Sequence, residues 1–368
     1  MVIGEGRRVS YLIGAGASQG CVDSVGSEHG ILMSHLNQEL SDEAGDLLEE
    51  SQYESREELK LLVNEIVTED MDFEQVITFL DNSPSAIHRS FADDLRTKFE
   101  YVIKNKLRNI KDEFGGRETK LYKVLLDIHE HPSSNEELVG IMTLNYDQYI
   151  ERAIEDFPEH CVDFGVEVRG TECDDSPIML LKLHGSFGWE ETWPITTNNG
   201  ESSLWIPPGI QKAKDRYPFN VIWGRAREML DCDVLRIIGC GLGPNDWDLI
   251  SLLFSTRHAN VQGEPYSIEV IDSPKRTESM TNDFPYLELR SLLQLDDIGQ
   301  NIVSEILGGS PRPYDSLSED EKDRLMKKTE KRSNWFQIWL TQMAELITEN
   351  HGTIETPNEH LKAFYEEA

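Results

Sequence analysis

The sequence predicts an α/β fold, in which a parallel sheet carries an inserted helical subdomain and is followed by C-terminal helices. Three observations favour this fold class. Short apolar runs alternate with helical patterns between residues 9 and 271. A long stretch with helical periodicity separates the first two apolar runs. After Leu292 the apolar runs stop and a charged helical pattern takes over.

The apolar runs are expected to form the strands of the sheet. They span residues 9–13, 138–144, 178–183, 234–238 and 267–271. Strands that are apolar along their whole length are typical of a parallel sheet that is buried on both faces.

The stretch between the first two strands is expected to be mostly helical. Apolar residues recur at helical spacing in residues 73–80 and again in residues 91–103. Because this stretch is too long for one crossover connection, we expect residues 31–130, approximately, to form a helical subdomain. It would be inserted into a sheet domain that spans residues 1–292.

Residues 293–368 are expected to form a helical extension that serves as an interface. Acidic and basic residues alternate there around an apolar stripe that includes Trp335 and Trp339. Core packing is the simpler explanation of the stripe itself, and contact with a second molecule is the alternative. Another segment, residues 187–218, is rich in Trp, Pro, Asn and Gly without periodicity, which indicates a long loop of the kind that often covers a site.

The composition excludes several classes of function. Acidic residues outnumber basic ones by 68 to 35, a net charge of −33 at pH 7, so we expect no direct binding to nucleic acid. No apolar run approaches the roughly 20 residues that a membrane span needs. The N-terminus lacks the pattern of a secretory signal, and the odd number of cysteines includes no C-x-x-C pair. We therefore expect a cytoplasmic protein with reduced thiols, without a membrane anchor or a structural zinc site.

A glycine-rich turn directly follows the first strand. It consists of Gly14, Ala15, Gly16, Ala17 and Ser18. Glycines at a strand-to-helix turn allow the backbone to approach a pyrophosphate, and the N-terminus of the following helix adds a favourable partial charge. A tight turn that binds no ligand is the alternative.

A second turn of the same kind follows the strand at residues 234–238. It contains Gly239, Cys240 and Gly241. Two glycine-rich strand ends in one sheet are less expected by chance than one, so the pair favours a nucleotide site.

Polar residues follow two further strands. Asn145 and Asp147 come after residues 138–144, and His184 comes after residues 178–183. Because the carboxyl ends of parallel strands line the ligand crevice, Asn145 could bind a ribose hydroxyl or position a water molecule, and His184 could accept a proton. Asp147 could orient Asn145 or simply cap the next helix. A structural role for His184 also stays open.

These four segments resemble, in their residues and their order, the motifs of the sirtuin superfamily. The resemblance extends over approximately residues 8–290. It implies a Rossmann-like NAD-binding domain with a smaller module inserted into it. It also implies cleavage of the bond between nicotinamide and ribose in NAD.

Departures from the family pattern indicate which branch the chain resembles. Sirtuin deacylases continue their first motif with Gly-Ile-Pro-Asp-Phe-Arg, whereas residues 30–35 here are Gly-Ile-Leu-Met-Ser-His. Deacylases also usually carry a four-cysteine zinc module, which this chain cannot build. Residues 145–147 and 245–248 look more like the prokaryotic sirtuin-like NAD hydrolases of antiphage defence. Where that branch often has serine, this chain has Gly241.

The resemblance therefore implies an NAD+ glycohydrolase that releases nicotinamide and ADP-ribose. NAD would be its substrate, and no zinc is expected. By this resemblance Asn145 would hold the nicotinamide ribose and the attacking water, His184 would act as general base, and Asp147 would support them. The two glycine-rich turns would hold the pyrophosphate. Asp272 would meet the adenosine ribose, although a turn residue is an equal alternative there.

Two other functions stay open. An NAD-dependent deacylase would use the same site but attack with an acyl-lysine oxygen. A non-catalytic subunit that senses NAD or ADP-ribose would need neither Asn145 nor His184. Because unrestrained NAD loss would poison the host, we expect activation by homo-oligomerisation or by a partner. Relatives in this branch act alone or with a DNA-translocating ATPase or an Argonaute-like protein.

Overall fold

The computed structural model describes residues 6–27, 29–50, 56–68, 73–166, 176–187, 189, 205–206, 215–243, 246–259, 266–293, 316–322, 324 and 334–351. Within these residues the fold is α/β, as predicted. A seven-stranded, entirely parallel sheet has the order β3-β4-β2-β1-β5-β6-β7. The strands are β1 (Arg7–Ile13), β2 (Glu136–Thr143), β3 (His160–Asp163), β4 (Ser176–Lys182), β5 (Val234–Ile238), β6 (Ser267–Ile271) and β7 (Arg290–Ser291).

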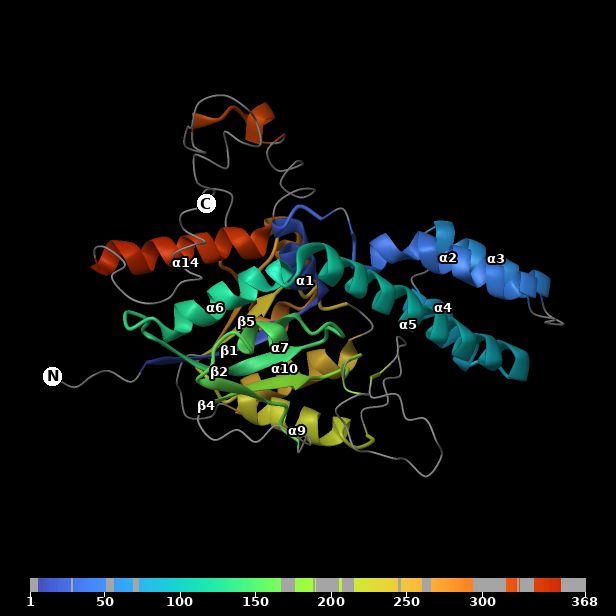
Figure 1. Cartoon of the computed structure of the whole chain (residues 1–368), viewed down its shortest axis with the longest axis horizontal. Coiled ribbons are helices and arrows are strands. Elements are labelled where there is room, and N and C mark those ends of the chain that lie inside the picture. Colours follow the sequence, from blue (N-terminus) through green and yellow to red (C-terminus); the bar gives the residue numbers. More distant parts are fainter. Residues whose placement is uncertain are drawn as a thin grey trace.

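Helices cover both faces of the sheet (Figure 1). One face carries α1 (Ala15–Ser24), α6 (Lys120–Glu130), α7 (Tyr149–Ile154) and α14 (Trp335–His351). The opposite face carries α9 (Phe219–Met229), α10 (Trp247–Ala259) and α11 (Pro274–Asp283). Tyr11 and Ile13 belong to the first core whereas Leu12 belongs to the second, because successive side chains of a strand point to opposite faces. The prediction of a sheet buried on both sides is confirmed.

The inserted helices form a third core of their own. They are α2 (Met33–Glu50), α3 (Arg56–Thr68), α4 (Phe73–Asp81) and α5 (Ala86–Phe114). Helix α5 joins this subdomain to the sheet domain (Figure 1). Phe91 and Phe99 in its first half lie in the third core, and Ile110 and Phe114 near its end lie in the first core.

Helix α14 packs on the sheet domain. Its residues Trp335, Phe336, Trp339 and Leu340 are buried in the first core, where α14 lies against α1 and α6. The apolar stripe of this helix is therefore largely a packing surface.

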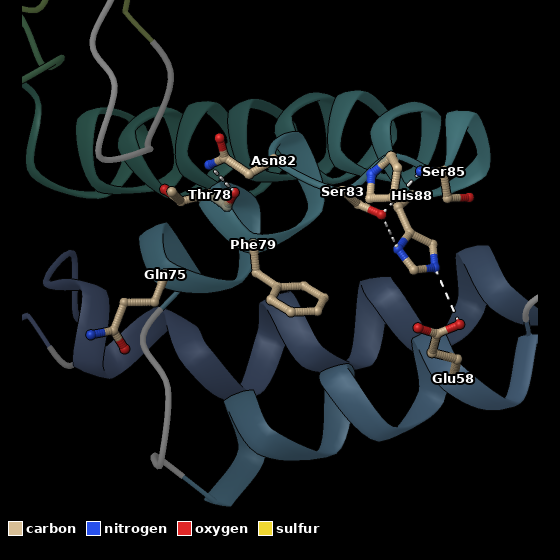
Figure 2. Close-up of a pocket in the computed structure, with 9 residues that line it drawn as sticks. Glu58, Gln75, Thr78, Phe79, Asn82, Ser83, Ser85 and His88 are labelled. Carbon is tan, nitrogen blue, oxygen red and sulfur yellow. Dashed lines mark hydrogen bonds and ion pairs between the residues drawn. The ribbon is translucent and has the colours of Figure 1, made fainter.

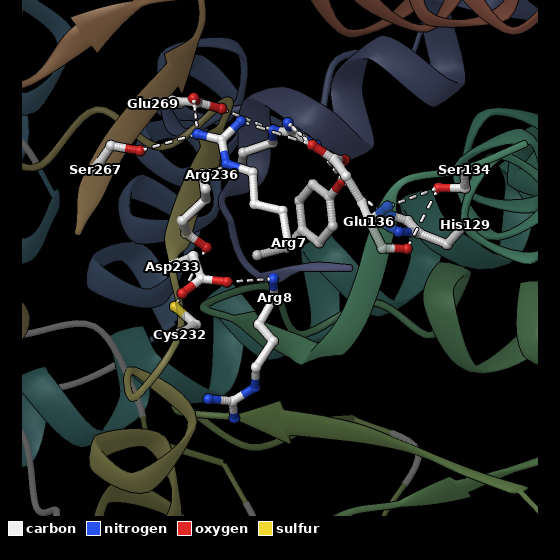
Figure 3. A network of polar contacts seen from close by, with 12 residues as sticks. Arg7, Arg8, His129, Ser134, Glu136, Cys232, Asp233, Arg236, Ser267 and Glu269 are labelled. Atoms are coloured by element: carbon white, nitrogen blue, oxygen red, sulfur yellow. Dashed lines mark hydrogen bonds and ion pairs between the residues drawn. The ribbon is translucent and has the colours of Figure 1, made fainter. Parts of the chain in front are cut away.

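A buried ionic network, drawn in Figure 3, contacts α14 through Trp339. The guanidinium of Arg236 on β5 donates to both carboxylate oxygens of Glu136, at 2.5 and 2.6 Å, and to Glu269 at 3.0 Å. It also stacks on the ring of Trp339, with Cζ 5.4 Å from the ring centroid. Because breaking a buried pair leaves an uncompensated charge, this network holds α14 and three strands in one arrangement.

The structure bears on two expectations, that the chain has no membrane span and that its thiols are reduced. Among the described residues no helix is both long enough and apolar enough to cross a membrane. Cys21, Cys232 and Cys240 are free and buried, but Cys161 is disulfide-bonded. The prediction that all thiols are reduced is therefore wrong for Cys161.

The strand order places a switch point between β1 and β5. From β1 the chain passes to β2 on one side, and after β4 it returns to β5 on the other side. In open parallel sheets, ligands bind outside the carboxyl ends of the strands where the order reverses in this way. The two glycine-rich turns follow these two strands.

Candidate active site

The two glycine-rich turns contact each other backbone to backbone. The N–H of Gly14 donates to Ile238 O, and the N–H of Gly16 donates to Gly239 O, each at 2.9 Å. A Cβ added at Gly14 would lie 2.6 Å from Cα of Cys240, and one at Gly16 would lie 2.8 Å from Gly239 O. Only glycine fits at these positions, so both turns are built for close approach.

Gly239 and Cys240 define the second turn. Gly239 has a φ of +58°, and a Cβ there would lie 2.2 Å from the backbone nitrogen of Ala17. Burial raises the pKa of Cys240 to about 12, so its thiol is neutral at physiological pH. The Cys240 side chain thus packs against the first turn and is no nucleophile.

Helix α1 begins at the first turn without a side-chain cap. Gly14 is its N-cap residue, and the first helical turn of α1 contains no acidic residue. The N-terminal end of a helix carries unsatisfied N–H groups and a partial positive charge. The N–H groups of Gly16 and Ala17 already donate to Gly239 O and Gly14 O, so a phosphate group would be received at the exposed Ala15.

Asn145 is held at the carboxyl end of β2 by the first turn. Its Nδ2 donates to Gly14 O at 3.0 Å and to Ser18 Oγ at 2.9 Å, while its backbone N–H donates to Thr143 Oγ1. Ser18 is fully buried and also contacts the hydroxyl of Tyr122, at 3.1 Å. Both amide hydrogens of Asn145 are thus engaged, which leaves Oδ1 to accept a hydrogen bond from a ribose hydroxyl or a water.

His184 lies at the end of the neighbouring strand. Thr143 of β2 pairs with Lys182 of β4, so Asn145 and His184 stand at matching positions two residues beyond the pairing. Both side chains are at least nine-tenths buried. The structure therefore brings these two predicted residues to neighbouring strand ends.

Aromatic residues surround these two strand ends. The ring of Tyr146 lies 6.3 Å from that of His184, 5.0 Å from that of Phe187 and 5.4 Å from that of Trp205. Trp205 stacks on Phe99 of α5, so the helical subdomain reaches the strand ends. The loop at residues 187–218 was expected to cover a site, and its described residues at 205–206 do lie against His184. No sequence signal linked Phe99 to this cluster.

Asp147 marks the start of α7. Its Oδ1 accepts the N–H of Tyr149 at 3.1 Å, an Asx-turn contact just before α7, whose N-cap residue is Gln148. Its carbonyl accepts a hydrogen bond from Nζ of Lys182, which also donates to Glu151 Oε1 at 2.7 Å. Burial raises the pKa of Glu151, and the charge of Lys182 opposes this shift. Asp147 therefore supports the Asn145 segment through its backbone carbonyl and its side-chain turn.

A cavity of about 240 Å³ opens on the other side of the turns. Gly16 and Gly239 line it where it borders the two glycine-rich turns, and Asp272 lines it at the end of β6. Burial raises the pKa of Asp272, and Arg276 works in the opposite direction. Trp335, at the start of α14, forms part of the wall. Sequence reasoning found Asp272 here but missed Arg276 and Trp335, because no local motif joins α11 and α14 to the turns.

The structure explains why a glycine, and not a serine, stands at position 241. A Cβ added there would lie 2.1 Å from Nη2 of Arg276. The space that a serine side chain would need at this position is thus taken by the Arg276 guanidinium. Asn245, from the segment that looks like the defence hydrolases, lies outside the described residues.

A larger cavity of about 750 Å³ lies within the helical subdomain (Figure 2). His88 reaches its wall, with Nδ1 2.8 Å from Ser83 Oγ and Nε2 3.4 Å from Glu58 Oε2. The hydroxyl of Ser83 also accepts the N–H of Ser85, the N-cap residue of α5. These contacts organise the start of α5, and none of the predicted site residues lines this cavity.

One group with metal-ligand geometry occurs among the described residues. It consists of Glu130, Glu159 and His160. His160 begins β3, so the group lies at the amino end of an edge strand. Both ring nitrogens of His160 already have partners, in Ser176 O and Glu130. This group is therefore separate from the crevice.

Comparison with known families matches one segment of the chain. Residues 139–284 match the model of the SIR2-like domain, and no curated protein matches the chain. The matched segment runs from β2 through α11, so it includes Asn145, His184 and the second glycine-rich turn. The match supports the sirtuin-like superfamily, and the parallel sheet fits its Rossmann-like fold. SIR2-like domains bind NAD, which indicates an NAD-related activity for this crevice.

Proposed function

We propose that the protein is an NAD+ hydrolase, which cleaves the nicotinamide–ribose bond to give nicotinamide and ADP-ribose. One observation carries the proposal. Asn145 is fixed by the first glycine-rich turn, through Gly14 O and Ser18 Oγ, and stands beside His184 on the next strand. A glycine-rich turn and two polar groups suited to ribose chemistry thus lie at adjacent strand ends.

The crevice suggests how the dinucleotide lies. The pyrophosphate would rest at the two glycine-rich turns, in the middle of the sheet. The 240 Å³ cavity on the β5–β6 side is smaller than the roughly 300–1,000 Å³ typical of complete ligand pockets, so it suits only the adenosine half. Asp272 would then meet the adenosine ribose. The nicotinamide half would extend the other way, toward Asn145 and His184.

The reaction needs positioning more than acid catalysis. Its transition state resembles an oxocarbenium ion, and nicotinamide leaves as a neutral molecule, so a carboxylic acid to protonate the leaving group is unnecessary. Asn145 Oδ1 would orient a ribose hydroxyl or the attacking water. His184 would accept the proton, a contribution of about 10²–10⁴-fold. Tyr146 and Trp205 would limit the access of bulk water to the reacting carbon.

The test is NAD consumption by the purified full-length chain, with product identification. We expect nicotinamide and ADP-ribose from the wild type. Asn145→Ala and His184→Ala should each reduce turnover by at least about 100-fold, because each removes a group that acts on the reacting ribose or water. Asn109→Ala, on the exposed face of α5, is the matched control and should keep wild-type turnover. Melting temperatures would show whether all variants fold.

Three results would contradict the proposal or its assignment of residues. Turnover that survives both substitutions would remove the assignment of Asn145 and His184. Nicotinamide release only in the presence of an acylated peptide would indicate a deacylase instead. Binding of ADP-ribose without turnover under any condition would favour a sensing subunit.

We also propose that this activity serves antiphage defence by NAD depletion, under control of homo-oligomerisation or a partner. The resemblance to defence hydrolases motivates the role, and the danger of unrestrained NAD loss motivates the control. The partner could be a DNA-translocating ATPase or an Argonaute-like protein. A purified monomer that hydrolyses NAD at full rate would rule out control by assembly.

A further inference from the structure

Arg276 lies directly over the second glycine-rich turn. It projects from α11, and its Nη2 and Cζ would lie 2.1 and 2.9 Å from a Cβ added at Gly241. It also lines the 240 Å³ cavity together with Gly16 and Gly239. A guanidinium is thus placed at the point where both turns meet.

The charge of Arg276 is only loosely compensated. Its Nε lies 3.7 Å from Asp272 Oδ2, which is longer than a hydrogen bond, and its side chain is 54% exposed. The guanidinium therefore keeps N–H donors that a ligand can use. In a chain with a net charge of −33, a cation beside two glycine-rich turns is well suited to attract an anion.

We propose that Arg276 binds the pyrophosphate of the dinucleotide, an inference that rests on the proposed function. The planar guanidinium matches two phosphate oxygens, and such charge-assisted contacts are among the strongest in proteins. The absence of a side chain at Gly241 lets the guanidinium approach the turn. Gly241 and Arg276 thus act as one unit, in which the glycine leaves the space and the arginine supplies the charge.

The location favours the pyrophosphate over a phosphate on the adenosine ribose. The turn at Gly239 and Gly241 lies against Gly16, at the open start of α1. Toward the ribose side the cavity wall is Asp272, whose carboxylate would repel an additional phosphate. If Arg276 bound a 2′-phosphate instead, its removal would weaken the binding of 2′-phosphorylated ligands only. Comparing ADP-ribose with 2′-phosphorylated ADP-ribose separates these two cases.

The experiment compares ligand affinities by calorimetry on the full-length chain. Arg276→Met should weaken ADP-ribose binding by about 10- to 100-fold, the worth of a charge-assisted hydrogen bond, and leave adenosine binding unchanged. Arg276→Lys should restore part of the affinity, because the charge stays but the planar fork is lost. Added salt should weaken ADP-ribose binding more in the wild type than in Arg276→Met.

Matched variants control for charge and for space. Arg225 on α9 is 51% exposed and pairs with an acid one turn away, so Arg225→Met removes a similar arginine away from the cavity and should bind ADP-ribose normally. Gly241→Ser should displace the guanidinium and reproduce the loss. Combined with Arg276→Met, it should add little, because both changes remove the same contact.

Three outcomes would overturn the inference. They are wild-type affinity for ADP-ribose in Arg276→Met, an equal loss for adenosine, and a loss confined to 2′-phosphorylated ADP-ribose. The readout is binding, so it is separate from hydrolysis. A wild type that binds ADP-ribose but never cleaves NAD would contradict the hydrolase and still test Arg276, whereas a wild type that binds neither ligand would remove both.

Discussion

Asn145 depends for its orientation on the hydroxyl of Ser18. The hydroxyl lies between Asn145 Nδ2 at 2.9 Å and the Tyr122 hydroxyl at 3.1 Å, and it is completely buried. The place of Ser18 in the first glycine-rich turn predicts a cofactor contact, yet its side chain faces Asn145. The motif thus joins the binding turn to the group that would act on ribose.

Ser18→Ala is expected to lower NAD turnover by about 10-fold or more while the protein stays folded. The change removes one of the two acceptors that fix the Asn145 amide, so its Oδ1 would sample unproductive orientations. Ser24→Ala is a matched control on the same helix, because Ser24 Oγ donates to Cys21 O within that helix and, among the described residues, makes no contact with Asn145. Steady-state rates for both variants provide the measurement, and equal rates would show that Gly14 O alone orients Asn145.

At the level of elements, α14 is attached to α1 at the edge of the cavity. Asn334 Nδ2 donates to Gly20 O at 2.5 Å, and Asn334 Oδ1 caps α14 by accepting the N–H of Gln337 at 3.1 Å. A Cβ added at Gly20 would lie 2.6 Å from that Oδ1. A segment distant in sequence thus helps to wall the adenosine side of the crevice.

Gly20→Ala should therefore destabilise the protein, against the usual trend for helices. An alanine inside a helix is normally favoured over glycine by about 0.5–1 kcal/mol. Here it would displace Asn334 and break both its cap of α14 and its hydrogen bond to Gly20 O, a combined loss of about 2 kcal/mol that exceeds the gain. Gly45→Ala in α2 and Gly224→Ala in α9 are matched controls, since nothing lies within 4 Å of a Cβ at either position.

Melting temperatures and hydrogen exchange would measure this difference. We expect the melting temperature to fall by a few degrees in Gly20→Ala and to stay level or rise in the two controls. Exchange should quicken at the first turn of α14, and ADP-ribose affinity should fall. A stabilised Gly20→Ala variant would mean that Asn334 moves aside without cost.

Local patterns explain which elements and site residues were predictable. The strands that were predicted are apolar runs, and Asn145 and His184 stand directly after two of them. Strand β3 is only half-buried at an edge, and β7 has two residues, so neither carries such a pattern. Arg276 and Asn334 reach the crevice only through the packing of α11 and α14. No pattern within one segment of the sequence contains that information.

For the molecule as a whole, the sheet face that carries α6 and α14 combines apolar packing with buried ionisable groups. His129 on α6 accepts a hydrogen bond from the hydroxyl of Tyr11, at 2.6 Å between Nε2 and Oη, and that hydroxyl receives a hydrogen bond from Arg236. Figure 3 shows His129 beside the Arg236 network. Burial lowers the pKa of His129 to about 4, so the folded protein holds it neutral.

This histidine makes stability depend on pH in a definite direction. The pKa of His129 is about 4 in the folded state and about 6.5 when unfolded, so the unfolded chain binds more protons between these values. The free energy of unfolding should therefore fall as the pH drops below 6.5, by about 1.4 kcal/mol per pH unit from this group. Above pH 6.5 the contribution is constant.

His129→Gln isolates this contribution, because glutamine can still accept the hydrogen bond from Tyr11 but does not titrate. Denaturant unfolding at intervals from pH 7.5 to 5 would measure the slope, and this window lies mostly above the range in which the many carboxyl groups titrate. The wild type should lose about 2 kcal/mol more than the variant between pH 6.5 and 5. Parallel curves for the two proteins would mean that His129 becomes protonated within the folded state, and that the network around Arg236 accommodates a second positive charge.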